Sequence, residues 1–105
     1  MKIVNRGYMI VKPKKAFLDW ANSCDEDYND LTNVEANVYL IEEEFYEDEP
    51  IIRANFKKVF RNELLAVSED ESKYPEISEK NFFEWFHAEL GSMVFDVMNA
   101  NLTAD

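Results

Sequence analysis

The side chains best suited to chemistry in this sequence are carboxylates, and half of them crowd into one stretch. Residues 25–49 hold eleven acidic side chains and no Lys or Arg, whereas the rest of the chain carries 11 acidic and 11 basic residues. Two runs of three acids end this stretch: Glu42, Glu43, Glu44, Glu47, Asp48 and Glu49. A dense anionic segment can recognise a basic surface by charge complementarity. It should also repel phosphates, so we expect no direct binding to nucleic acid.

A second candidate chemistry is calcium binding in the acidic loop. Asp25, Asp27 and Asn29 match positions 1, 3 and 5 of an EF-hand-like loop. The match then fails, because Asp30 stands where the loop needs glycine and Ala36 where it needs a bidentate glutamate. Half a ligand set cannot surround the ion, so the sequence predicts a solvated acidic loop and no metal.

A nucleophilic pair is a third candidate, since His87 is the only histidine and Cys24 the only thiol. Nothing in the sequence brings these two side chains together. The chain has only Gly7 and Gly91, far apart, which excludes a glycine-rich phosphate loop and a nucleophile elbow. We therefore predict no catalytic residue and no cofactor. Acid/base chemistry by carboxylates, with His87 as a helper, stays open as the alternative.

The elements that must position these side chains follow from apolar spacing. A β-prone run at 8–11 predicts a strand, and Pro13 after it predicts the first turn of a helix that ends near Ser23. A second β-prone run, at 38–41, predicts the strand that leads into the two acidic runs. Residues 51–67 predict an amphipathic helix. Its apolar face consists of Ile52, Phe56, Val59, Phe60, Leu64 and Val67.

A third helix is predicted after Ser78, a favourable N-cap, with Gly91 just beyond its end. The apolar side chains of one face are Phe82, Phe86 and Leu90. A last strand is predicted at 93–98, which gives the order β-α-β-α-α-β. The prediction is an α+β fold: a single two-layer domain over 1–105, with a three-stranded sheet and three helices.

Composition indicates a folded chain of the cell interior. The sequence is 47% hydrophobic and 14% aromatic despite a net charge of −11, which is too apolar for disorder. No run approaches the ~18 apolar residues of a membrane span. A lone cysteine is also unusual for a small secreted domain. We predict a cytoplasmic protein with no membrane association.

The charge and the aromatic content each leave two interpretations open. Arg53, Lys57 and Arg61 form a basic row on the predicted second helix, which either neutralises the preceding acids or lies apart from them. We favour the second, because six acids outnumber three bases. The aromatic side chains are more numerous than a small core often needs. We expect them mainly in the core, and the alternative is that some lie in a homodimer interface or a partner-binding face.

Four stretches of this chain resemble those of a known group of proteins. They are RGYMIVKPK at 6–14, FLDWANS at 17–23, FEWF at 83–86 and SMVFD at 92–96. They look like stretches of short acidic bacterial proteins of uncharacterised function. The resemblance implies a bacterial, cytoplasmic, single-domain protein, and it implies no activity and no site residues.

These observations lead to two hypotheses of different classes. The first is a non-enzymatic interaction or regulatory protein that binds a basic partner surface through residues 25–49, including a variant in which the carboxylates mimic nucleic acid. The second is a small enzyme that uses carboxylates and His87. A hollow containing His87 and two carboxylates would favour the enzyme, and a flat or convex acidic face would favour binding.

Overall fold

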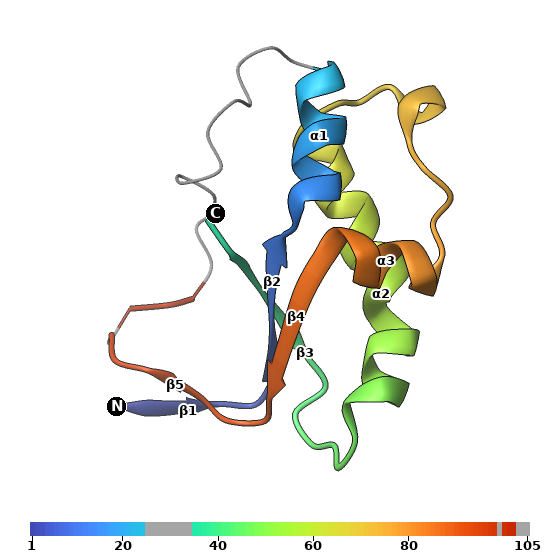
Figure 1. The fold of residues 1–105 in the computed structure, drawn as a ribbon. Helices are drawn as coiled ribbons and strands as arrows, with labels where there is room; N and C mark the ends of the chain where they lie inside the picture. Colours follow the sequence, from blue (N-terminus) through green and yellow to red (C-terminus); the bar gives the residue numbers. More distant parts are fainter. Residues whose placement is uncertain (25–34, 99, 103–105) are drawn as a thin grey trace.

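The computed structural model describes residues 1–24, 35–98 and 100–102 (Figure 1). In chain order the elements are β1 (Lys2–Val4), β2 (Gly7–Pro13), α1 (Lys15–Cys24), β3 (Asn37–Ile41), α2 (Asp48–Leu65), the short 3-10 helix η2 (Glu71–Lys73), α3 (Glu79–Trp85), β4 (Phe86–Gly91) and β5 (Val94–Asp96). This confirms a small α+β fold with three α-helices. The strands are divided between two sheets: β3-β2-β4 form a three-stranded main sheet, and β1 pairs with β5 in a separate ribbon.

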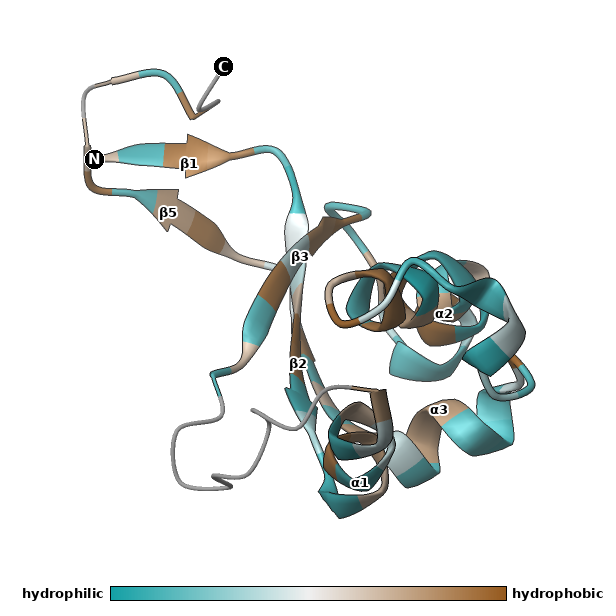
Figure 2. Ribbon diagram, turned by 90° about the horizontal axis from the view of Figure 1, so that it is seen from above, coloured by the Kyte–Doolittle hydropathy of each residue, from teal (hydrophilic) through white to brown (hydrophobic). Residues whose placement is uncertain are grey.

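The main sheet is antiparallel and covered by helices on one face. Tyr8 lies opposite Leu40 on β3 and Gly91 on β4, so β2 is the central strand. Side chains alternate along β2: Met9 and Val11 are fully buried, whereas their neighbours are more exposed. Figure 2 shows all three α-helices on the same side of this sheet. The sheet and its helices therefore make the two predicted layers.

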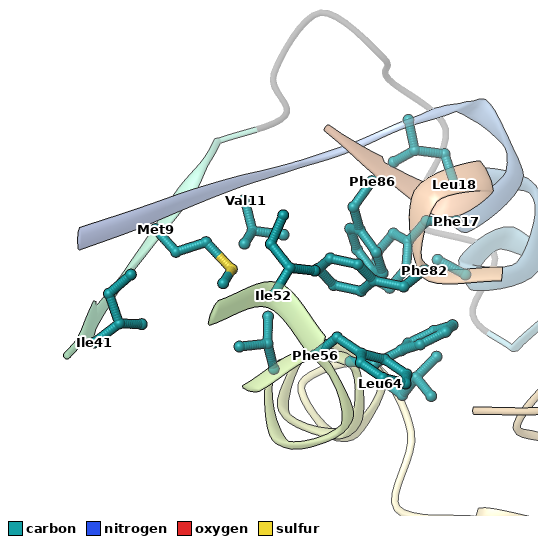
Figure 3. Close-up of a cluster of buried hydrophobic side chains, with 13 residues drawn as sticks. Met9, Val11, Phe17, Leu18, Ile41, Ile52, Phe56, Leu64, Phe82 and Phe86 are labelled. Atoms are coloured by element: carbon teal, nitrogen blue, oxygen red, sulfur yellow. The ribbon is translucent and has the colours of Figure 1, made fainter. Parts of the chain in front are cut away.

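The core fills the space between these layers (Figure 3). The ring of Phe60 is fully buried at its centre, 5.4 Å from the Phe86 ring and 6.0 Å from the Phe82 ring, centroid to centroid. Tilted and edge-on ring pairs at such distances stabilise the fold by more than the burial of their apolar area alone. The buried apolar side chains are Met9, Val11, Phe17, Leu18, Ala21, Ile41, Ile52, Phe56, Val59, Phe60, Leu64, Phe82 and Phe86.

The predicted second helix is confirmed, and it begins earlier than the apolar pattern indicated. Five of its six predicted apolar residues are buried, and Val67 packs half-buried just beyond the helix end. Glu47 has an extended backbone and is the N-cap, so the helix starts at Asp48. Asp48 and Glu49 occupy its first turn. Acids are favourable there beside the positive end of the helix dipole.

The predicted third helix is only half right. Ser78 does cap it, accepting a hydrogen bond from the Asn81 N–H, but α3 ends at Trp85 and residues 86–91 form β4. The backbone N–H of Lys14 donates to the Trp85 carbonyl at 2.8 Å, and its Nζ donates to the Phe83 carbonyl at 2.7 Å. These bonds satisfy carbonyl groups that a longer helix would have used itself. The third strand of the main sheet is therefore β4, and the prediction that placed His87 on a helix was wrong.

The predicted last strand exists in part and lies elsewhere. It is reduced to β5, which pairs with β1 instead of joining the main sheet: Lys2 lies opposite Asp96, Ile3 opposite Phe95 and Val4 opposite Val94. We call β1 and β5 together the terminal ribbon. Figure 2 shows that it projects from the main sheet on the side away from the helices.

Within the described part of the chain, none of the helices combines the length and the apolar character that crossing a membrane requires.

Candidate functional site

The six carboxylates singled out by the sequence lie together between β3 and α2. Glu42, Glu43 and Glu44 follow β3 directly, Glu47 is the N-cap of α2, and Asp48 and Glu49 form its first turn. We call residues 42–49 the acidic turn. All six acids are exposed. The acidic turn is thus a concentrated anionic surface in contact with water.

The basic row of α2 does not neutralise the acidic turn. Arg53 forms its ion pair with Glu79 of α3, with 3.7 Å between Nε and Oε2. Within residues 1–24, 35–98 and 100–102, no ion pair involves the acidic turn. Glu42 accepts hydrogen bonds from Asn55 Nδ2 of α2 at 3.0 and 3.2 Å, but this amide carries no positive charge. The charges of the turn are therefore presented to solvent.

Beside the acidic turn lies a hollow of about 290 Å³ that joins it to the terminal ribbon. It is lined by Ile3, Val4, Glu43, Glu44, Phe45, Ser92 and Met93. The ribbon itself exposes apolar side chains, with Ile3 71% and Phe95 51% exposed on opposite strands. Carboxylates and apolar surface are thus neighbours on this part of the molecule, an arrangement suited to a partner that is both basic and apolar.

A second hollow, of about 370 Å³, lies between β3 and α2, and we call it the edge groove. Its lining residues are Tyr39, Leu40, Ile41, Asn55, Lys58, Val59 and Asn62. The acidic turn begins directly after Ile41, the last residue of β3, and Ile41 lines the edge groove. The carboxylates therefore follow the edge groove directly in the sequence.

A polar cluster around the buried Glu63 fixes the wall of the edge groove. Glu63 is only 4% exposed, and its Oε2 accepts hydrogen bonds from the Tyr39 hydroxyl at 2.5 Å and from Asn37 Nδ2 at 2.7 Å. Asn62 Nδ2 in turn donates to the Tyr39 oxygen at 3.0 Å. Burial, with added contributions from Glu63, raises the pKa of Tyr39, although the bond from Asn62 opposes this shift. The phenol is therefore a neutral donor that holds β3 against α2.

This cluster was missed in the sequence, although one indication was visible. Glu63 falls on the apolar face of α2, four residues after Val59 and three after Phe60. An acid at such a position has to find polar partners. Nothing local showed that Tyr39 and Asn37 would be those partners.

The structure separates His87 from Cys24. His87 is exposed on β4, opposite Lys12 of β2, on the face of the main sheet away from the helices. Cys24 is the last residue of α1, which packs on the other face. His87 lines neither the edge groove nor the hollow beside the terminal ribbon. The arrangement that would have favoured the enzyme is not found at these two hollows.

Most of the calcium-like loop, residues 25–34, lies outside the described residues. Among the residues that are described, no group of three or more His, Cys, Asp or Glu side chains is arranged to hold a metal ion.

Comparisons with known proteins add no relative: no protein-family model matches the chain, and no curated protein and no solved structure is significantly similar to it.

Proposed function

We propose that this chain is a non-enzymatic interaction or regulatory protein that binds a basic partner surface through residues 25–49, with the acidic turn as the contact. One observation carries the proposal: all six carboxylates of the turn are exposed, and in the described parts of the chain none forms an ion pair. An anionic surface that is not neutralised internally accelerates and orients the encounter with a cationic one.

The expected partner is a protein, since the same carboxylates repel a phosphate backbone. The hollow beside Glu43 and Glu44 has both carboxylates and apolar side chains in its lining, which favours a partner surface that places an apolar side chain next to Lys or Arg. The single cysteine supports a place in the cytoplasm, and the resemblance in the sequence supports a bacterial origin.

Affinity capture from a cell extract, at low and high salt, tests the proposal with a pair of matched variants. The first replaces Glu47, Asp48 and Glu49 by Gln. The control replaces Glu69, Glu71 and Glu76, which are exposed on the connection between α2 and α3, and removes the same charge. We expect the first variant to lose the salt-sensitive partner and the control to keep it.

Stability has to be measured on the same variants. Neutralising the first turn of α2 removes favourable dipole interactions of about 0.3–1 kcal/mol each and relieves repulsion of similar size. The free energy of unfolding should therefore change by less than about 1 kcal/mol or rise slightly. A larger loss of stability with partner capture intact would make the turn an internal counter-charge and would contradict the proposal.

A further inference from the structure

We propose that the outer edge of β3 is a docking edge, to which an extended peptide of the basic partner adds as a fourth strand of the main sheet. The inference deepens the proposed function and rests on it for the charge of the partner. It adds the conformation of the bound segment, the edge that binds it and the pattern of its side chains.

The first support is the position of β3 in the sheet. The strand order β3-β2-β4 makes β3 an outermost strand, and it pairs with β2 on one side alone within the described residues. The backbone groups on its other side are available to a further strand. Protected edges usually carry Lys, Pro or a bulge, but β3 reads Asn-Val-Tyr-Leu-Ile and contains neither Lys nor Pro.

The second support is the course of the edge groove. Tyr39, Leu40 and Ile41 are consecutive in β3, and all three line it. Because consecutive residues of a strand point to opposite faces, a hollow lined by all three runs along the strand edge, where the backbone is accessible. The opposite wall comes from Asn55, Lys58, Val59 and Asn62, which form one stripe of α2. An extended chain beside a strand and a helix fits such a groove.

The third support is that the groove is already formed. The bonds from Tyr39 and Asn37 to Glu63, and from Asn62 to Tyr39, tie β3 to α2 at several points. A strand edge held at a fixed distance from its helix loses little conformational freedom when a peptide binds.

The charges favour a basic peptide over a second copy of this chain. Glu42, Glu43 and Glu44 begin where β3 ends, so Lys or Arg at one end of the peptide would meet them, whereas Lys58 disfavours a base opposite the middle of β3. A second copy of β3 contains no Lys or Arg, so it would bring no positive charge to these carboxylates.

The outer face of β3 defines the rest of the pattern. Val38 and Leu40 are 63% and 51% exposed there, and they can pack against apolar side chains at alternate positions of the added strand. The expected segment therefore has Lys or Arg at one end, followed by alternate β-branched or aromatic residues.

The probe is a set of heptapeptides with Lys-Arg at one end, followed by Thr alternating with Val, Ile, Phe or Tyr. Each has a control peptide of the same sequence in which alternate backbone nitrogens are methylated. Methylation keeps the charge and the side chains but removes the donors of a strand ladder. We expect at least one peptide to bind and its methylated control to bind about tenfold more weakly or not at all, because several hydrogen bonds are lost.

Amide hydrogen exchange measured by NMR locates the peptide. Bound peptide should slow exchange at alternate amides of β3, while amides on the free edge of β4 keep their rates and serve as the internal control. Lys58→Trp should block the edge groove and abolish binding. Lys57→Trp, at an exposed neighbour of α2 that does not line the groove, should leave binding intact.

The results that would contradict strand addition at β3 can be told apart from one another. Equal binding of the methylated peptides would overturn strand addition and leave charge-based binding by the acidic turn standing. Binding by no peptide, protection of β4 instead of β3, or self-association through β3 would also overturn the inference. The capture experiment with the Gln variants decides the proposed function separately.

Discussion

The hydroxyl of Tyr39 donates a 2.5 Å hydrogen bond to Glu63, a carboxylate that is only 4% exposed. The two residues belong to the edge strand β3 and to the last turn of α2. A buried carboxylate is costly without polar partners, so the bond both satisfies Glu63 and attaches the edge of the sheet to the helix layer.

Replacing Tyr39 by Phe should lower the free energy of unfolding by about 1–2 kcal/mol, because Glu63 loses one of its donors and Asn62 loses its acceptor. Urea unfolding measures the change. Tyr46→Phe is the matched control, since Tyr46 is fully exposed and should show no effect. Equal effects of the two substitutions would mean that the hydrogen bonds of the Tyr39 hydroxyl contribute nothing to stability.

Stability should fall in alkaline solution, partly through Tyr39. Burial raises its pKa in the folded protein, whereas the unfolded chain ionises this phenol near pH 10. The stabilising contribution is therefore complete below about pH 10 and is lost as the pH rises toward the folded pKa. Burial also raises the pKa of Tyr74, which is present in both the native chain and the Tyr39→Phe variant. The decline measured between about pH 9 and 12 should be shallower in Tyr39→Phe than in the native chain, and parallel curves would contradict this assignment.

The terminal ribbon should support a weak homodimer. Ile3 and Phe95 lie opposite one another and are largely exposed, and pairing two ribbons would remove them from water. Light scattering at micromolar concentrations should show a mass above 12.4 kDa that returns to the monomer value in Phe95→Ser. Leu65→Ser, at an exposed leucine ending α2, should not dissociate it. A monomer mass at every concentration would exclude the dimer.

Gly7 should tolerate no side chain. A Cβ there would lie 2.6 Å from the carbonyl oxygen of Glu42 and 2.8 Å from that of Gly91, both of which are backbone atoms. Gly7→Ala should therefore lower the free energy of unfolding by about 1–3 kcal/mol. The three atoms nearest to a Cβ at Gly91 all belong to the Tyr8 side chain, which can turn outward on the open face of the sheet. Thermal unfolding of the two alanine variants compares them directly, and a larger loss at Gly91 would refute the argument.

Local patterns in the sequence predicted some elements well and failed where two patterns coincide. The apolar face of α2 was predicted because no strand pattern competes with it over 51–67. Phe82, Phe86 and Leu90 fit one helix face, yet Phe86 and Leu90 also alternate with exposed His87 and Glu89 as in a strand. Residues far away in sequence decided the outcome, since Lys14 supplies the bonds to the last carbonyls of α3.

The same distinction applies to the candidate site. The exposure of the acidic turn followed from its composition, because six adjacent carboxylates cannot be buried together. The edge groove could not be predicted, because it depends on β3 being outermost in the sheet and on α2 lying beside it. Strand order is a property of the whole fold, and no spacing within residues 37–41 encodes it.

The pairing of β1 with β5 brings together positions 2 and 96, so this ladder encloses nearly the whole chain. Closing so long a loop is entropically costly, and only three residues of each strand are gained in return. A two-stranded ribbon is also marginal on its own. The ribbon must therefore assemble late in folding, after the main sheet has brought its two ends near. It can also open and reclose many times while the rest of the molecule stays folded.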